Sequence, residues 1–312
     1  MSVLSSRYAF VLQRLAWGTI VLWAVLTATW LVIASLPESR MVGWGTVEMG
    51  FGAAYETPPG PLALYFDWMT RLLTLQWGQS IYYEKPVLDI YATRLPVTMS
   101  YLVPGVLVST LLGSGLSTYT ATNRASPLDK VLSVASNVGL SVPTFVLAFI
   151  TLTFMSSTLG WIRIYDLSLP LWHRQNATRS LLPIGIIAVN FFAVQARHAR
   201  SETTERLGAR YVKTAQAKGA GQFRKAIHIF RNTWPSLGSL VLGESLGLLF
   251  LSAVVIEKVL LVPGIAVATF NGFASGDPML SFTSVFGLVL FGVLGTVLQD
   301  FTRVLLDPRV DD

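Results

Sequence analysis

The sequence contains no cysteine among its 312 residues, and only three histidines, His173, His198 and His228. A disulfide framework, an iron–sulfur cluster and a cysteine nucleophile are therefore excluded. The histidines lie far apart along the chain and share no spacing typical of metal ligands. We accordingly expect no metal site, and no cofactor bound by this chain.

Charge is also scarce. Charged residues make up 13% of the chain and apolar residues 52%, whereas soluble domains carry about 25% charged residues. Disordered chains are polar and rich in charge, so disorder is disfavoured as well. The composition is typical of an all-α polytopic membrane protein, because helices satisfy their own backbone hydrogen bonds within a bilayer.

Two motifs that would indicate catalysis are missing. The chain has neither a Gly-x-x-x-x-Gly-Lys-Ser/Thr phosphate loop nor a His-Glu-x-x-His zinc motif. No pair of carboxylates lies within an apolar run, as a proton relay would require. We therefore expect that the chain is not an enzyme and that any ATP hydrolysis takes place in another subunit.

Long runs without charge predict about six transmembrane helices, because a bilayer core of roughly 30 Å needs about 20 apolar helical residues. The runs are 15–36, 95–123, 131–162, 180–196, 232–256 and 278–299. The fourth run is short, and we expect its helix to continue into the basic stretch that follows. The uncharged segment 259–276 is interrupted by Pro263, Gly264 and Asn271, and is predicted to be re-entrant or interfacial.

The distribution of basic residues predicts the topology. With six spans, 15 of the 23 lysines and arginines fall on one side, and the positive-inside rule places that side in the cytoplasm. Both termini are then cytoplasmic, in a multi-pass protein of the plasma or inner membrane. The net charge of +6 thus reflects topology, and we expect no nucleic-acid partner. Three segments follow: 1–36, an N-terminal span; 37–94, an external segment; and 95–312, a core with a cytoplasmic loop at 197–235.

The external segment contains a predicted amphipathic helix. Apolar residues recur with roughly helical period after the Pro58–Pro61 break, and Trp68, Trp77 and Tyr82 suit a membrane–water interface. Two interpretations remain open. The helix lies on the outer surface of the bilayer, or it caps a translocation path.

The cytoplasmic loop 197–235 is the most distinctive segment. It holds nine basic residues and only two acidic ones, Glu202 and Glu205. Residues 209–218 are predicted to form a helix that Gly219 ends, and a second short helix is predicted over 222–231, before Pro235. Tyr211, Ala215 and Lys218 would share one face. A basic loop that only sets orientation, a membrane-surface helix and a docking site for a cytoplasmic partner are the alternatives, and the number of charges favours docking.

Several motifs, in order, resemble the permeases of ATP-binding-cassette (ABC) importers, and most closely their dipeptide, oligopeptide and nickel branch. They are the loop segment Tyr-Val-Lys-Thr-Ala-Gln-Ala-Lys-Gly at 211–219, Arg94-Leu95-Pro96, Gly139-Leu140-Ser141-Val142-Pro143, Pro263-Gly264, Asp277-Pro278 and Leu306-Asp307-Pro308-Arg309.

The resemblance implies a membrane-spanning subunit that forms half of a translocation path. The implied partners are a second, similar permease, two cytoplasmic ATPases that use ATP, and an external substrate-binding protein. The residues implied to couple to the ATPases are Tyr211, Thr214, Ala215, Ala217, Lys218 and Gly219. The substrate is expected to be a small solute, foremost a di- or oligopeptide, with nickel chelates and oligosaccharides left open.

An ATP-independent secondary transporter or channel is the alternative from another class. It would need charged groups within the membrane for coupling or selectivity. Only Glu244, near the middle of the fifth apolar run, meets that description in the sequence. Glu244 is therefore predicted to face the translocation path or the interior of the helix bundle.

Overall fold

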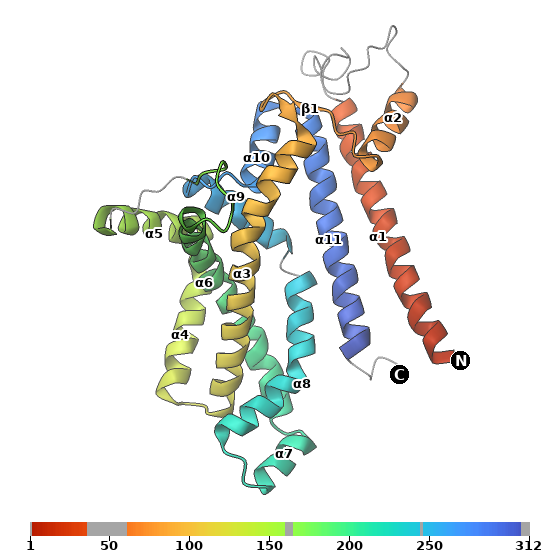
Figure 1. The fold of residues 1–312 in the computed structure, drawn as a ribbon. Helices are drawn as coiled ribbons and strands as arrows, with labels where there is room; N and C mark the ends of the chain where they lie inside the picture. Colours follow the sequence, from red (N-terminus) through yellow and green to blue (C-terminus); the bar gives the residue numbers. More distant parts are fainter. Residues whose placement is uncertain (1, 36–60, 160–164, 244–245, 307–312) are drawn as a thin grey trace. The chain divides into compact units, whose positions relative to one another are not determined.

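The computed structural model describes residues 2–35, 61–159, 165–243 and 246–306. Within these ranges the chain is almost entirely helical, with one short antiparallel hairpin (Figure 1). The elements are α1 (Ser2–Ala34), α2 (Pro61–Leu73), β1 (Gln79–Ser80), β2 (Lys85–Pro86), α3 (Val87–Thr122), α4 (Pro127–Ser141), α5 (Thr144–Leu159), α6 (Arg174–Arg206), α7 (Arg210–Ala217), α8 (Gln222–Gly243), α9 (Leu246–Val259), α10 (Ile265–Ser275) and α11 (Pro278–Leu306).

Four of the six predicted spans are continuous helices. Among the described residues, α1, α3, α6 and α11 each contain a stretch long and apolar enough to cross a membrane. Helix α6 runs on to Arg206, which confirms that the short fourth run continues into the basic stretch. Helix α10 has 11 residues, which is too short to cross a bilayer core of roughly 30 Å.

The third apolar run does not form one continuous helix but a bent pair of helices. Helices α4 and α5 are bent by 104° relative to each other. The physical cause lies at Val142 and Pro143. Proline cannot donate a backbone hydrogen bond, and it forces the preceding residue out of the helical region; Val142 is extended, with φ −89° and ψ 115°. If the bent pair is one span, the described helices provide five candidates.

The fifth run was predicted to open at Pro235 after a separate short helix, and that boundary is wrong. Helix α8 continues from Gln222 to Gly243 through Pro235. Ala226, Ile229, Thr233 and Leu237 are all buried and recur every three or four residues, so one packed stripe extends across the proline. Glu244 lies outside the described residues, and its place in the translocation path stays a prediction.

The chain forms two compact units, which we describe separately. The first unit combines Met1–Thr98 with Pro263–Val297, and the second combines Met99–Val262 with Leu298–Asp312. Two of the three boundaries fall inside helices, since α3 and α11 contribute to both units. The segments 1–36, 37–94 and 95–312, which the sequence suggested from membrane topology, are a different division and remain a prediction.

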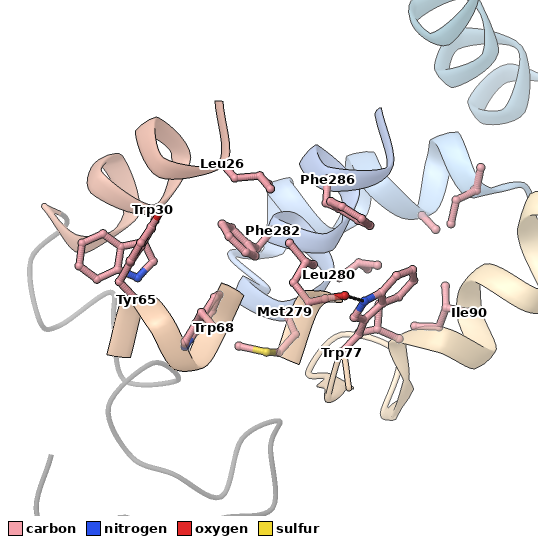
Figure 2. Packing of buried hydrophobic residues seen from close by; sticks show 14 residues of the cluster. Leu26, Trp30, Tyr65, Trp68, Trp77, Ile90, Met279, Leu280, Phe282 and Phe286 are labelled. Carbon is pink, nitrogen blue, oxygen red and sulfur yellow. Dashed lines mark hydrogen bonds between the residues drawn. The ribbon is translucent and has the colours of Figure 1, made fainter. Parts of the chain in front are cut away.

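An aromatic core holds the first unit together. Trp68 of α2 packs edge-to-face on Phe282 of α11, with ring centroids 5.1 Å apart, and Trp77 packs on Phe286 at 6.2 Å (Figure 2). The Trp77 indole N–H also donates a hydrogen bond to the carbonyl of Leu72, 2.9 Å away. The inner face of the amphipathic helix α2 is therefore buried in protein.

A buried carboxylate fastens the hairpin of the first unit to the start of α11. Asp277 is only 1% exposed. One of its oxygens accepts hydrogen bonds from the Ser80 hydroxyl (2.6 Å) and the Tyr82 N–H (3.1 Å), and the other accepts from the Leu280 N–H (3.0 Å). The carboxylate thus links a loop to a helix N-terminus nearly 200 residues later.

Helices α3 and α6 approach each other closely in the second unit. Small residues recur every fourth position along α3, at Gly105, Ser109, Gly113, Ser117 and Ala121, and all five are buried. This spacing lets two helix backbones approach each other closely within a membrane. A Cβ atom on Gly113 would lie 2.9 Å from Cβ of Gln195 and 3.0 Å from the carbonyl oxygen of Phe192 on α6.

Candidate functional site

The candidate site is the loop that joins α6 to α8 and carries the short helix α7. Ala209 begins this helix, and its carbonyl accepts from the amides of Val212 and Lys213, both at 3.1 Å. At the other end, the Ala220 N–H donates to the Ala215 carbonyl (3.0 Å) and the Gly219 N–H donates to the Gln216 carbonyl (2.9 Å). These two bonds form a Schellman motif, which satisfies carbonyls at the helix end.

Gly219 ends the helix, as the sequence predicted, and its backbone is left-handed. Its φ is +74°, in the left-handed region that a Schellman motif requires at this position. No heavy atom lies within 4 Å of the position that a Cβ would occupy. The backbone angle, and not crowding, is therefore what favours glycine here.

The predicted coupling residues on and after α7 differ in how far they are exposed. Val212 is fully buried, while Tyr211 and Ala215 are half-buried beside it. Four of the predicted coupling residues are exposed: Thr214, Ala217, Lys218 and Gly219. Val212, which packs the helix onto the protein, was not singled out from the sequence. It could have been found as the only aliphatic residue larger than alanine in Arg-Tyr-Val-Lys-Thr-Ala-Gln-Ala.

The exposed surface around α7 is strongly basic. Arg210, Lys213 and Lys218 are exposed, as is Arg224 at the start of α8, and residues 207–231 contain no acidic side chain. Phe223 is also 67% exposed. This combination of cationic charge and exposed apolar surface suits a protein partner whose surface is acidic, or an anionic surface.

A salt bridge joins the first turn of α4 to α6, at the same end of the second unit as α7 (Figure 1). An Arg200 guanidinium nitrogen lies 2.5 Å from a carboxylate oxygen of Asp129, whose side chain is 8% exposed. The second Asp129 oxygen accepts from the Ala125 N–H at 3.1 Å. Arg124 adds a hydrogen bond to the Thr204 hydroxyl at 2.9 Å. The start of α4 is thus fixed to the helix that leads into α7.

A carboxylate that was not predicted to be a functional residue lies inside the helix bundle of the second unit. Glu257 near the end of α9 is 1% exposed, and it accepts a hydrogen bond from the Tyr101 hydroxyl of α3 at 2.8 Å. In the sequence it follows an apolar run directly, and Lys258 is the next residue. The pairing partner lies 156 residues away, so no local pattern connects the two residues.

Several apolar helices and an exposed cationic loop define a polytopic helical membrane protein that has a surface suited to a partner. The model of the family described as binding-protein-dependent transport system inner membrane component matches residues 94–312. The chain belongs to this family. It is thus a multi-pass membrane permease of a type that works with ATPase and binding-protein partners.

Individual relatives extend the similarity to nearly the whole chain. A peptide transport system permease protein of Brucella abortus is 30% identical, over 97% of this chain and 98% of its own length. The dipeptide transport system permease protein of Lactococcus lactis is 28% identical, over 79% of each chain. A peptide ABC transporter permease of Sinorhizobium fredii is also 28% identical, over 80% of each chain.

Proposed function

We propose that this chain is the membrane-spanning permease of an ATP-driven importer of di- or oligopeptides, and that it forms half of the translocation path. The proposal rests on family membership, because the family model matches residues 94–312 and this range includes the loop that holds α7. The printed names of the relatives suggest peptides as the substrate class. A second, similar permease, two cytoplasmic ATPases and one external binding protein would complete the assembly.

In this proposal the coupling surface is the exposed side of α7 with its C-terminal turn. Thr214, Ala217, Lys218 and Gly219 are accessible to an ATPase, while Val212 keeps the helix attached to its own chain. Tyr211 and Ala215 would then support the helix more than they touch the partner. Movement of the ATPase would be transmitted directly to α6, which leads into α7. It would be transmitted to α4 through the salt bridge between Asp129 and Arg200.

Uptake by the purified complex tests the proposal. The chain is reconstituted with its second permease and the ATPases in proteoliposomes, with ATP at the ATPase side and the binding protein at the other. Uptake of a labelled dipeptide is expected only when ATP and the binding protein are both present. ATP-independent uptake by this chain alone would contradict the importer and favour a secondary transporter.

The proposed topology places both termini and α7 in the cytoplasm. Because the sequence has no cysteine, single cysteines can be introduced without background labelling. In intact cells, a membrane-impermeant thiol reagent is expected to label Trp172→Cys, at a residue that is 83% exposed, and to leave the exposed Gln222→Cys unlabelled. Permeabilised cells provide the control, since both variants should then react. Labelling of Gln222→Cys in intact cells would reverse the orientation.

A further inference from the structure

Three polar side chains from three helices meet at the break between α4 and α5. The Thr144 hydroxyl at the start of α5 donates a hydrogen bond to the side-chain oxygen of Asn190 on α6, 3.2 Å away. It also lies 3.5 Å from the hydroxyl of Ser252 on α9. The three positions are 46 and 108 residues apart in sequence. We call these three residues the polar trio.

The polar trio lies where the membrane environment should disfavour it. Each member falls within one of the predicted apolar spans, at 131–162, 180–196 or 232–256. Polar side chains at membrane depth usually face a bundle interior or a water-filled cavity and often mark a solute pathway. All three are half-buried, so the polar trio is neither sealed inside the protein nor fully on its surface.

The broken backbone beside the polar trio also needs either cover by protein or contact with water. Irregular backbone within a membrane is tolerated only where protein covers it or where it lines water, because lipid offers no hydrogen bonds. Val142 is half-buried and Pro143 is exposed, so the described part of this chain covers the break only in part. The break and the polar trio are separate observations, and both point to water at this position.

Among the described residues, Asn190 of the polar trio retains unused hydrogen-bonding capacity. The Asn190 amide nitrogen donates to the Ile186 carbonyl at 3.2 Å and has a second hydrogen. Its oxygen accepts from Thr144 and has a second lone pair. One donor and one acceptor on the same amide match the C=O and N–H groups that every peptide unit presents.

We infer that Thr144, Asn190 and Ser252 form a contact site for the peptide backbone of the substrate, in a water-filled part of the translocation path. The identity of the ligand rests on the proposed peptide-importer function, whereas the access of water does not. Backbone contacts of this type would accept peptides of different sequence, since they do not read side chains. The competing role is a purely structural hydrogen bond between helices.

Cysteine accessibility distinguishes these roles, and the full reconstituted complex is used. Ser252→Cys is a near-isosteric change, and a water-soluble cationic thiosulfonate reports whether water reaches it. Two controls lie on α5: Ala148→Cys, one turn after Thr144 and fully buried, and Phe149→Cys, on the exposed apolar face. We expect Ser252→Cys to react and both controls to react far more slowly. Thr144→Cys is the second reporter, should Ser252→Cys not assemble.

Substrate protection tests the ligand. With ATP, binding protein and a saturating dipeptide, labelling of Ser252→Cys should slow relative to the same mixture without peptide. Asn190→Ala is expected to raise the half-saturating peptide concentration about tenfold, equivalent to 1.4 kcal/mol, with no loss of assembled complex. A structural role would instead lower the amount of complex.

Each outcome has a separate meaning. Equal reactivity of Ser252→Cys and Ala148→Cys overturns the water-filled path. Reactivity without protection by peptide overturns the substrate contact. If the parent complex takes up no dipeptide while the labelling contrast persists, the proposed substrate class fails, and the inference about water access stands.

Discussion

Gly219→Val is expected to abolish ATP-driven uptake while the protein is still expressed and inserted into the membrane. Gly219 has φ +74°, and a β-branched residue in this conformation costs roughly 1–2 kcal/mol. An isolated helix of only eight residues is marginal on its own, so relief of the strain should disrupt the turn and redirect α7. Copurification of the ATPases and uptake in vesicles with internal ATP measure the effect.

Gly219→Asn is the matched control, because asparagine is the side chain that best tolerates the left-handed region after glycine. It introduces a Cβ and a polar group into the same open space, but with less backbone strain. We expect it to keep most of the ATPase association and uptake. If Gly219→Val transports at the parental rate, the Schellman turn is not needed for coupling, and the function then depends on family membership alone.

Gly113→Leu should have the largest effect on stability. The added side chain would meet Cβ of Gln195 at 2.9 Å and the Phe192 carbonyl at 3.0 Å, and the latter is backbone that cannot move aside independently of α6. Overpacking of a tight interface typically costs about 1–3 kcal/mol and sometimes more. The variant is expected to lower the midpoint of thermal unfolding in detergent and the yield of monodisperse protein.

Gly115→Leu provides the comparison on the same helix, two residues away. A Cβ at Gly115 has no heavy atom within 4 Å, so this variant adds the same side chain to open space. Its unfolding midpoint should stay close to that of the parent protein. Equal destabilisation by both substitutions would mean that the close approach of α3 and α6 does not limit stability.

Gly219→Val and Gly113→Leu test different properties. Gly219→Val acts on a turn at the aqueous end of the second unit and should leave unfolding of the helix bundle almost unchanged. Gly113→Leu acts inside the bundle and should reduce function only through loss of folded protein. Measuring both unfolding and ATPase copurification for both variants therefore separates coupling from stability.

The sequence by itself determined the features that depend on local physical chemistry. Apolar runs of bilayer length specified α1, α3, α6 and α11, since the cost of burying charge in lipid acts on each segment alone. The residues of α7 and the glycine after it defined a short helix and its end, because helix capping involves only neighbouring residues. Pro143 was visible in the sequence, but proline alone does not specify a bend of 104°.

Only the tertiary structure decided which distant residues meet and which face of each helix is covered. Arg200 pairs with Asp129, which is 71 residues away in sequence. Tyr101 donates a hydrogen bond to Glu257, which is 156 residues away. The buried side of α7 is set by packing on its own chain, which covers Val212 fully and Tyr211 and Ala215 in part. Helix α8 continues through Pro235, and its buried residues before and after the proline lie on one face of the helix. Such pairings depend on how helices pack, and hydropathy along the chain holds no information about them.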